Sequence, residues 1–199
     1  MAKDHYTSRG LTTPEMMVKA LAVRNDFEIA HVERVDIVSI LEFKLVQRFP
    51  RFRLIIRQDT EMDTNAFADP VHDQIVVRRS IYRAACEENP EARLILAHEL
   101  GHFLLHREKH VTMHMDPSGA TQPIKRMNAT ESSEDQADMF ARHFLAPPQI
   151  AFRFRHDAKT LALVTAVPLR ISRGNVTMSK RPDVFAIRAM SSASWAQPN

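Results

Sequence analysis

The spacing of hydrophobic residues predicts helices in the first quarter of the chain. One helix is expected to begin at Thr13, as its N-cap, with Pro14 in the first turn and apolar residues at helical spacing behind it. A second helical pattern covers about residues 29–49, and Pro50 ends it. Helices therefore account for most of the first fifty residues.

Two short runs of branched residues, bounded by charged ones, predict β-strands at residues 53–57 and 74–78. The polar stretch 59–73 between them is expected to form a loop, or a further short strand and a turn. Helical patterns return at residues 94–106 and in a later helix that ends at Pro147. Together these elements predict an α+β fold that is mainly helical, with a small β-sheet beside the helix at 94–106.

Charge divides the chain into two parts. Residues 147–199 contain eight Lys or Arg and two Asp, for a net charge of +6, whereas the preceding residues contain nineteen basic and twenty-two acidic residues, for a net charge of −3. We therefore expect one domain at residues 1–149 and a basic C-terminal helical extension at residues 150–199. Within the extension, residues 157–173 are expected to form two short helices.

Nothing in the sequence indicates export or membrane insertion. The single cysteine, Cys86, excludes an intrachain disulfide and is compatible with a reducing compartment. The first ten residues lack the apolar core of a signal peptide, and no later stretch approaches membrane-spanning length. We therefore expect a cytoplasmic protein.

The stretch His98-Glu99-Leu100-Gly101-His102 has the spacing of a metal site. Four residues of α-helix turn the chain just past a full revolution, so the two histidines project from one face, about 6 Å apart along the axis. Zinc accepts two such imidazoles, and a catalytic zinc usually has a third protein ligand and a water molecule. Glu99 can take the proton of that water as it attacks a carbonyl carbon, which is the chemistry of the H-E-x-x-H motif.

The third metal ligand has several candidates. A metzincin would carry a glycine and a third histidine where this chain has Leu105 and Glu108, so that class is excluded. His106 lies about 12 Å beyond His98 along a continued helix, which is too far to share one ion. The histidines that continue the every-fourth-residue row are expected to be solvated or to belong to a second site: His110 and His114.

A glutamate from the helix after residue 130 is the preferred third ligand. Glu134 falls on the inward, apolar face of that helix, in its first turn. Asp138, one turn later, is placed to accept a hydrogen bond from a liganding histidine and so to set its tautomer. The pair Glu131 and Asp135 has the same spacing and stays an alternative, ranked second because Asp135 falls off the apolar face.

These segments resemble the ImmA/IrrE family of zinc metallopeptidases. The resemblance rests on residues 97–106, AHELGHFLLH, followed by residues 134–147, ExxADxFAxxFLxP, in that order. It implies a zincin-like metallopeptidase core with zinc held by His98, His102 and Glu134. It also implies a substrate class, because family members studied as regulators cleave helix-turn-helix repressors and so release phage, mobile-element or stress-response genes.

We therefore expect a zinc-dependent endopeptidase that cleaves a helix-turn-helix repressor at a specific site, with Glu99 as the catalytic carboxylate. The candidates for stabilising the oxyanion are Tyr82 and His143. Residues 74–78 are the expected edge strand, to which a substrate peptide adds as a further strand.

Other classes of function stay open. One is a zinc-binding regulator that binds a repressor or DNA without proteolysis, with the basic C-terminal extension as its working surface. In the peptidase interpretation the same extension is a solvated cap on the catalytic core. Another class is a structural metal protein, whose zinc would have no position left for water.

Overall fold

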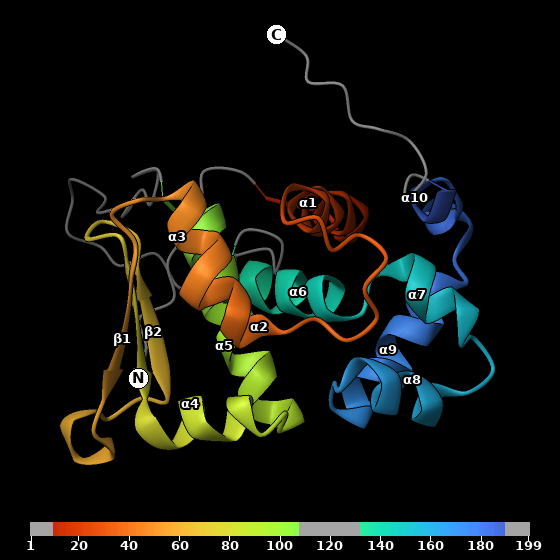
Figure 1. Ribbon diagram of the computed structural model, residues 1–199. Helices are drawn as coiled ribbons and strands as arrows, with labels where there is room; N and C mark the ends of the chain where they lie inside the picture. Colours follow the sequence, from red (N-terminus) through yellow and green to blue (C-terminus); the bar gives the residue numbers. More distant parts are fainter. Residues whose placement is uncertain (1–9, 108–131, 190–199) are drawn as a thin grey trace, which may run out of the picture.

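The computed structural model describes residues 10–107 and 132–189. A small β-sheet lies at one end of the molecule, a central group of helices follows, and a C-terminal group of helices lies at the other end (Figure 1). Helix α5 (Pro90–Leu105) runs beside the sheet and packs against α6 (Ser133–Leu145), which also packs against α1 (Thr13–Asp26). The predicted α+β class, mainly helical with a sheet beside the metal-motif helix, is confirmed.

The sheet has three strands in the order β1-β3-β2. β1 (Arg53–Arg57) runs parallel to β3 (Gln74–Arg78), and β2 (Ala66–Asp69) runs antiparallel to β3. Both predicted strands are confirmed, but the prediction that residues 74–78 form the edge beside the metal helix is wrong. Part of the polar stretch 59–73 forms β2, which takes that edge beside α5, so β3 is the central strand.

The first helix is capped one residue earlier than the sequence predicts. Thr12, rather than Thr13, is the N-cap of α1: its side chain accepts a hydrogen bond from the Glu15 amide, and the Glu15 carboxylate accepts one from the Thr12 amide at 2.8 Å. This capping box places Pro14 at the second helical position, where no N–H has a partner within the helix.

The second predicted helix is shorter than its pattern. It begins only after Asp36, whose side chain accepts a hydrogen bond from the amide of Ser39 at 3.0 Å. Before it, the buried guanidinium of Arg24 donates to the carbonyl oxygen of Val32, so a side chain replaces a helical partner there and the backbone stays irregular. The helical part consists of α2 (Ile37–Ser39), a π-helical segment (Ile40–Lys44) and α3 (Leu45–Arg48).

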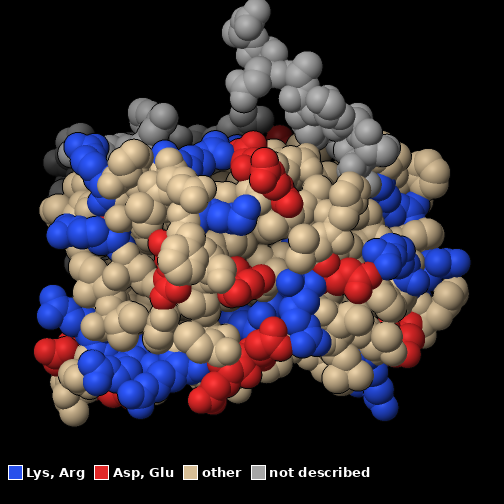
Figure 2. Space-filling view, in the orientation of Figure 1, with Lys and Arg blue, Asp and Glu red and all other residues tan. Residues whose placement is uncertain are grey.

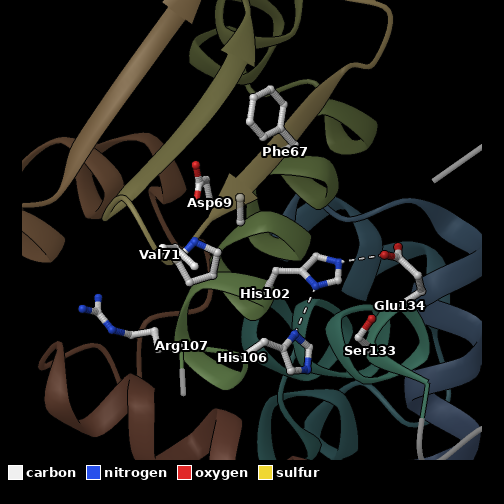
Figure 3. Close-up of a pocket in the computed structure, with 10 residues that line it drawn as sticks. Phe67, Asp69, Val71, His102, His106, Arg107, Ser133 and Glu134 are labelled. Carbon is white, nitrogen blue, oxygen red and sulfur yellow. Dashed lines mark hydrogen bonds and ion pairs between the residues drawn. The ribbon is translucent and has the colours of Figure 1, made fainter. Parts of the chain in front are cut away.

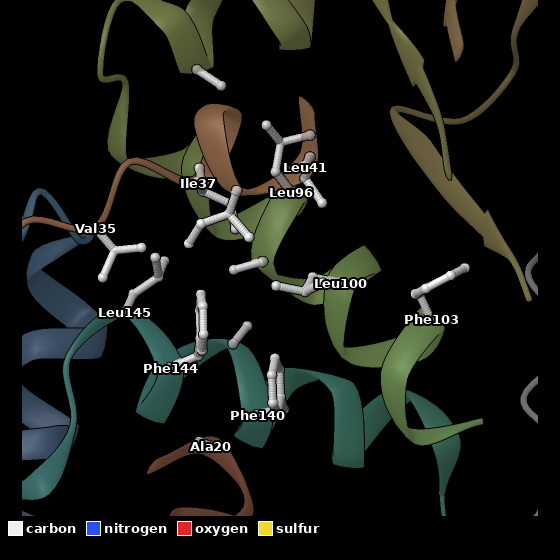
Figure 4. Close-up of a cluster of buried hydrophobic side chains, with 14 of the residues drawn as sticks. Ala20, Val35, Ile37, Leu41, Leu96, Leu100, Phe103, Phe140, Phe144 and Leu145 are labelled. Carbon is white, nitrogen blue, oxygen red and sulfur yellow. The ribbon is translucent and has the colours of Figure 1, made fainter. Parts of the chain in front are cut away.

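The main core lies where α5 and α6 pack together (Figure 4). The large buried side chains that they contribute are Leu96, Leu100, Phe103, Phe140, Phe144 and Leu145. Gly101 permits the close approach, because a Cβ there would lie 3.0 Å from Cδ1 of Phe140 and 3.2 Å from Cα of Ala137. The spacing of these two helices therefore depends on a missing side chain at position 101.

The remaining helices flank this core. Helix α4 (Arg79–Cys86) connects the sheet to α5. Two helices are present where residues 157–173 predict them, α8 (Ala158–Thr165) and α9 (Leu169–Ser179), although the second continues beyond the predicted stretch. The C-terminal elements are α7 (Pro148–Arg153), α8 (Ala158–Thr165), α9 (Leu169–Ser179), a 3₁₀ turn (Pro182–Val184) and α10 (Phe185–Ala189). Within the described ranges, no helix has the length and apolar character needed to cross a bilayer.

Two arginines from the preceding part of the chain bind the C-terminal end of α8. Arg34 donates to the carbonyl oxygens of residues 163 and 164, at 2.5 and 3.3 Å. Arg93, which is only 2% exposed, donates to those of residues 165 and 166, both at 3.2 Å. Carbonyls at a helix end lack partners within the helix and carry partial negative charge, so both arginines are well placed there.

Candidate metal centre

One face of α5 forms the first half of the candidate site. Asn89 caps this helix by accepting hydrogen bonds from two backbone amides at 3.1 Å, and Pro90 takes the first helical position. The helix continues without a break to Leu105, so His98 and His102 lie one turn apart on a single face. This is the arrangement that their spacing predicts.

The second half of the site is the first turn of α6. Ser132 caps this helix by accepting a hydrogen bond from the Asp135 amide at 3.2 Å. Glu134 is its second residue, and the positive end of the helix dipole favours a carboxylate there. Of the alternative pair, Glu131 lies outside the described residues and Asp135 is exposed.

The three predicted ligands converge. Nε2 of His98 lies 3.3 Å from one carboxylate oxygen of Glu134, and Nε2 of His102 lies 3.4 Å from the other. The two Nε2 atoms are 2.9 Å apart. One ligand atom from each residue lies within 4.8 Å of the other two.

These separations suit one zinc-sized ion. Zinc bonds of about 2.0–2.1 Å to nitrogen and oxygen, in a tetrahedral arrangement, place neighbouring donors roughly 3.3 Å apart. The separation of 2.9 Å between the two nitrogens, and those of 3.3 and 3.4 Å from each nitrogen to a different oxygen of the Glu134 carboxylate, lie close to that value. The donor set of two imidazoles and one carboxylate is also one that zinc takes in catalytic sites.

Charge around His98 favours a cation at this point. Its Nδ1 lies 2.9 Å from Oδ1 of Asp138. Burial alone would lower the pKa of His98, but its hydrogen bonds to Asp138 and Glu134 together outweigh burial and raise the pKa to about 10. Hydrogen bonds from His102 and His98 hold the pKa of Glu134 well below its usual range. The cluster thus stabilises positive charge, whether a proton or a metal ion.

Glu99 is a buried residue of α5 that contacts β2. It is only 8% exposed, and burial raises its pKa, against the effects of His98, His102 and a backbone hydrogen bond from Ala68. A carboxylate with a raised pKa is a stronger base than one in water. Its contact with Ala68 connects the motif helix to β2.

A cavity of about 730 Å³ opens beside the cluster (Figure 3). One wall comes from β2 and the turn after it, the other from the end of α5 and the start of α6. The lining residues are Phe67, Ala68, Asp69, Pro70, Val71, His102, His106, Arg107, Ser133 and Glu134. The sequence left a short strand within residues 59–73 as one alternative, but nothing in that polar stretch indicated that it forms a wall of the site.

Arg107 holds the two walls together. Its guanidinium donates to Oδ1 of Asp73 at 2.5 Å, on the turn between β2 and β3. It also lies over the rings of Phe49 and Phe103, 4.3 and 4.7 Å from their centroids. The pairing fixes the turn against the end of α5, a role that nothing in the local sequence indicates.

Three other residues considered from the sequence lie outside the ligand cluster. His106 is not among the converging ligands; its Nδ1 faces Nδ1 of His102 at 3.1 Å, and burial lowers its pKa to about 4. Tyr82 donates to Glu42 at 2.5 Å, and His143 is buried in α6. Neither Tyr82 nor His143 lines the cavity, so the structure does not support either as an oxyanion-stabilising group.

Comparison with known families decides the class. The family model of the IrrE N-terminal-like domain, peptidase family M78, matches residues 52–168, more than half of the chain. The chain belongs to the M78 peptidase family. A search of curated proteins finds no match. The resemblance seen in the two motifs is therefore confirmed.

Membership of the M78 family supports a peptidase-type function and a zincin-like α+β core, and it implies a metal cofactor. The matched range contains the sheet, α5, α6 and the converging ligands. It also runs past residue 149 through α8, so it does not mark the boundary that we place between residues 1–149 and 150–199. That boundary stays a prediction.

Proposed function

We propose that this protein is a zinc-dependent endopeptidase in which His98, His102 and Glu134 hold Zn²⁺. The observation that carries the proposal is the convergence of these three donors at zinc-compatible separations, beside the buried Glu99 of an M78 peptidase. Asp138 accepts the Nδ1 proton of His98 and so leaves Nε2 free to bind the metal.

Glu99 is the general base of the proposed reaction. Zinc held in the cluster would lower the pKa of a water molecule and polarise the scissile carbonyl. Glu99 takes the proton of that water as the water attacks the carbonyl carbon, and then gives the proton to the leaving amine. The burial that raises its pKa suits both steps, because the carboxylate must first accept a proton and later release it.

The substrate peptide binds along β2 in this proposal. β2 has a strand partner on one side only among the described residues, and an added strand would hold a peptide by its main chain. Phe67 and Val71 are 43% and 62% exposed on the cavity wall. The adjacent subsite should therefore accept an apolar side chain.

The proposed substrate is a DNA-binding repressor of the helix-turn-helix type. This follows from the family resemblance, whose regulatory members act as anti-repressors on phage, mobile-element or stress-response genes. Such a substrate places the reaction in the cytoplasm, in agreement with the single Cys86.

The C-terminal extension serves as a cap in this proposal, rather than as a DNA-binding surface. Arg153 pairs with Glu33 at 2.5 Å, and Arg170 pairs with Glu91, so both cations are directed at the catalytic part of the chain. On the face in Figure 2, basic and acidic side chains are interspersed rather than gathered by sign. A DNA-binding regulator without proteolysis remains the competing hypothesis.

The decisive experiment compares the wild type with Glu99→Gln. Each zinc-loaded protein is incubated with lysate of the source cell, and new protein N-termini are identified by mass spectrometry. Glu99→Gln should retain zinc and lose turnover, because it removes the base and no ligand. We expect one or a few cuts that are absent in the variant, within a small DNA-binding protein.

Equal N-termini in both samples, with one zinc bound in each, would contradict the peptidase proposal. DNA binding that is strong, salt-dependent and unaffected by Glu99→Gln would then support the regulator instead. Loss of zinc in His102→Ala and in Glu134→Ala tests the ligand set separately from turnover.

A further inference from the structure

A hydrogen-bonded chain lies behind His102, on the side away from Glu134. Nδ1 of His102 faces Nδ1 of His106 at 3.1 Å (Figure 3). Nε2 of His106 faces Oε1 of Gln136 at 3.2 Å. His106 follows the last residue of α5, and Gln136 is a buried residue of α6. These hydrogen bonds therefore connect α5 and α6, the two helices that supply the three proposed ligands.

Gln136, at the end of this series of hydrogen bonds, determines which ring nitrogens of His106 and His102 carry protons. The amide oxygen of Gln136 can only accept, so Nε2 of His106 donates to it. A neutral imidazole has one donor and one acceptor nitrogen, so Nδ1 of His106 must then accept. In the neutral His102 ring that binds a metal, the proton between the two rings consequently belongs to Nδ1, and the lone pair of Nε2 replaces the proton that Nε2 would otherwise donate to Glu134.

We propose that His106, oriented by Gln136, is a positioning residue that selects the metal-binding tautomer of His102. The inference rests on the proposed zinc site. His106 does for His102 what Asp138 does for His98, but with a neutral acceptor in place of a carboxylate. It also explains how a histidine too far along the helix to bind the ion itself serves the metal centre.

The test uses two near-isosteric substitutions, His106→Asn and His106→Leu. The Oδ1 atom of asparagine can take the place of the accepting Nδ1, whereas leucine fills similar space without an acceptor. Zinc affinity is measured at neutral pH by competition with a chromophoric chelator. Loss of a partner behind a metal ligand typically costs 10–100-fold in affinity. We expect that loss for His106→Leu and an affinity within a few-fold of the wild type for His106→Asn.

The outcomes separate this inference from the proposed function. If the wild type binds no zinc, or if His102→Ala retains it, the metal-site proposal fails. If the wild type binds one zinc and both position-106 variants bind it equally well, the positioning role is overturned. Equal weakening in both variants overturns it too, because packing rather than the acceptor would then matter.

A second readout needs no variant and so does not depend on folding of His106→Leu. Long-range ¹H–¹⁵N spectra of the zinc-loaded wild type report which ring nitrogens carry protons. We expect His106 with its proton on Nε2 and His102 with its proton on Nδ1. A proton on Nδ1 of His106, or on both of its nitrogens, would overturn the inference.

Discussion

The two ends of α5 are fixed to the rest of the protein by different kinds of contact. Toward its C-terminal end, Gly101 lies against the ring of Phe140 and the backbone of Ala137 in α6, and no side-chain hydrogen bond is involved in this approach. Toward its N-terminal end, the buried guanidinium of Arg93 donates to carbonyl oxygens of Val35, at 2.8 Å, and of the end of α8. One end depends on close packing and the other on hydrogen bonds.

The two ends of α5 therefore differ in what they determine: one the metal geometry, the other the attachment of the C-terminal helices. The distance between α5 and α6 sets the separation of the histidines from Glu134, so close packing determines the metal geometry. The contacts of Arg93 join the C-terminal helices to the core at the end of α8, outside the ligand cluster. Substitutions at the two ends should therefore separate metal binding from conformational stability.

Gly101→Val should have the largest effect. The new side chain would overlap Phe140 and the backbone of Ala137, which forces the helices apart. Overpacking of this kind costs about 3 kcal/mol of unfolding free energy. We expect a matching loss in urea unfolding and weaker zinc binding in a chelator competition.

The matched control is Gly174→Ala in α9. A Cβ at position 174 meets no atom within 4 Å, so alanine there should gain about 0.5–1 kcal/mol through its higher helix propensity and leave zinc affinity unchanged. If Gly101→Val bound zinc as tightly as Gly174→Ala does, helix spacing would not govern the metal geometry.

Arg93→Met tests the other end of α5. Methionine retains much of the packing of the arginine stem but leaves the carbonyls of residues 35, 165 and 166 without this donor. Loss of these bonds should cost about 2 kcal/mol in unfolding free energy. Zinc affinity of the folded protein should remain that of the wild type. A variant that lost zinc while its unfolding curve was unchanged would contradict this difference between the two ends.

Local sequence spacing predicted which side chains converge. His98 and His102 needed only the helical period, and Glu134 and Asp138 needed only the apolar face of one more helix, after which the family resemblance linked the two. The short strand β2 was only one of two alternatives for residues 59–73, and its place at the edge was not predicted, because its four residues gain their conformation by pairing with β3. The consequence was the wrong edge strand.

The supporting contacts could not be predicted from spacing either. His106 lies outside the converging donor atoms, as the helical spacing predicts, but its contact with Gln136 depends on which residue of α6 lies opposite the end of α5. The arginines that bind the end of α8 lie 72 or more residues away in sequence. A charge count also treats paired cations of the extension, such as Arg153 and Arg170, like free surface charge, which is why the basic extension suggested DNA binding.

The smallest expected change in unfolding free energy concerns His143 of α6. This helix packs against α5, and Asn175 of α9 donates to carbonyl oxygens at its C-terminal end, so α6 contacts both the metal-site helix and the C-terminal helices. The side chain of His143 is only 4% exposed, and its Nδ1 has no hydrogen-bond partner among the described residues. Burial therefore lowers the pKa of His143 to about 4, from an ordinary value of 6.5.

Below pH 6.5 the unfolded chain binds a proton at His143 that the folded protein excludes, so stability should fall as the pH decreases from 6.5 toward 4. Between pH 7 and pH 5.5 this residue should account for about 1 kcal/mol of the decrease. His143→Leu removes the titrating group, so its unfolding free energy, measured in urea across this range, should fall less steeply than that of the wild type by that amount. Other titrating groups are common to both proteins and cancel in the difference. Parallel pH profiles would mean that His143 is protonated without cost in the folded protein, and that the α6 interior is more polar than its packing indicates.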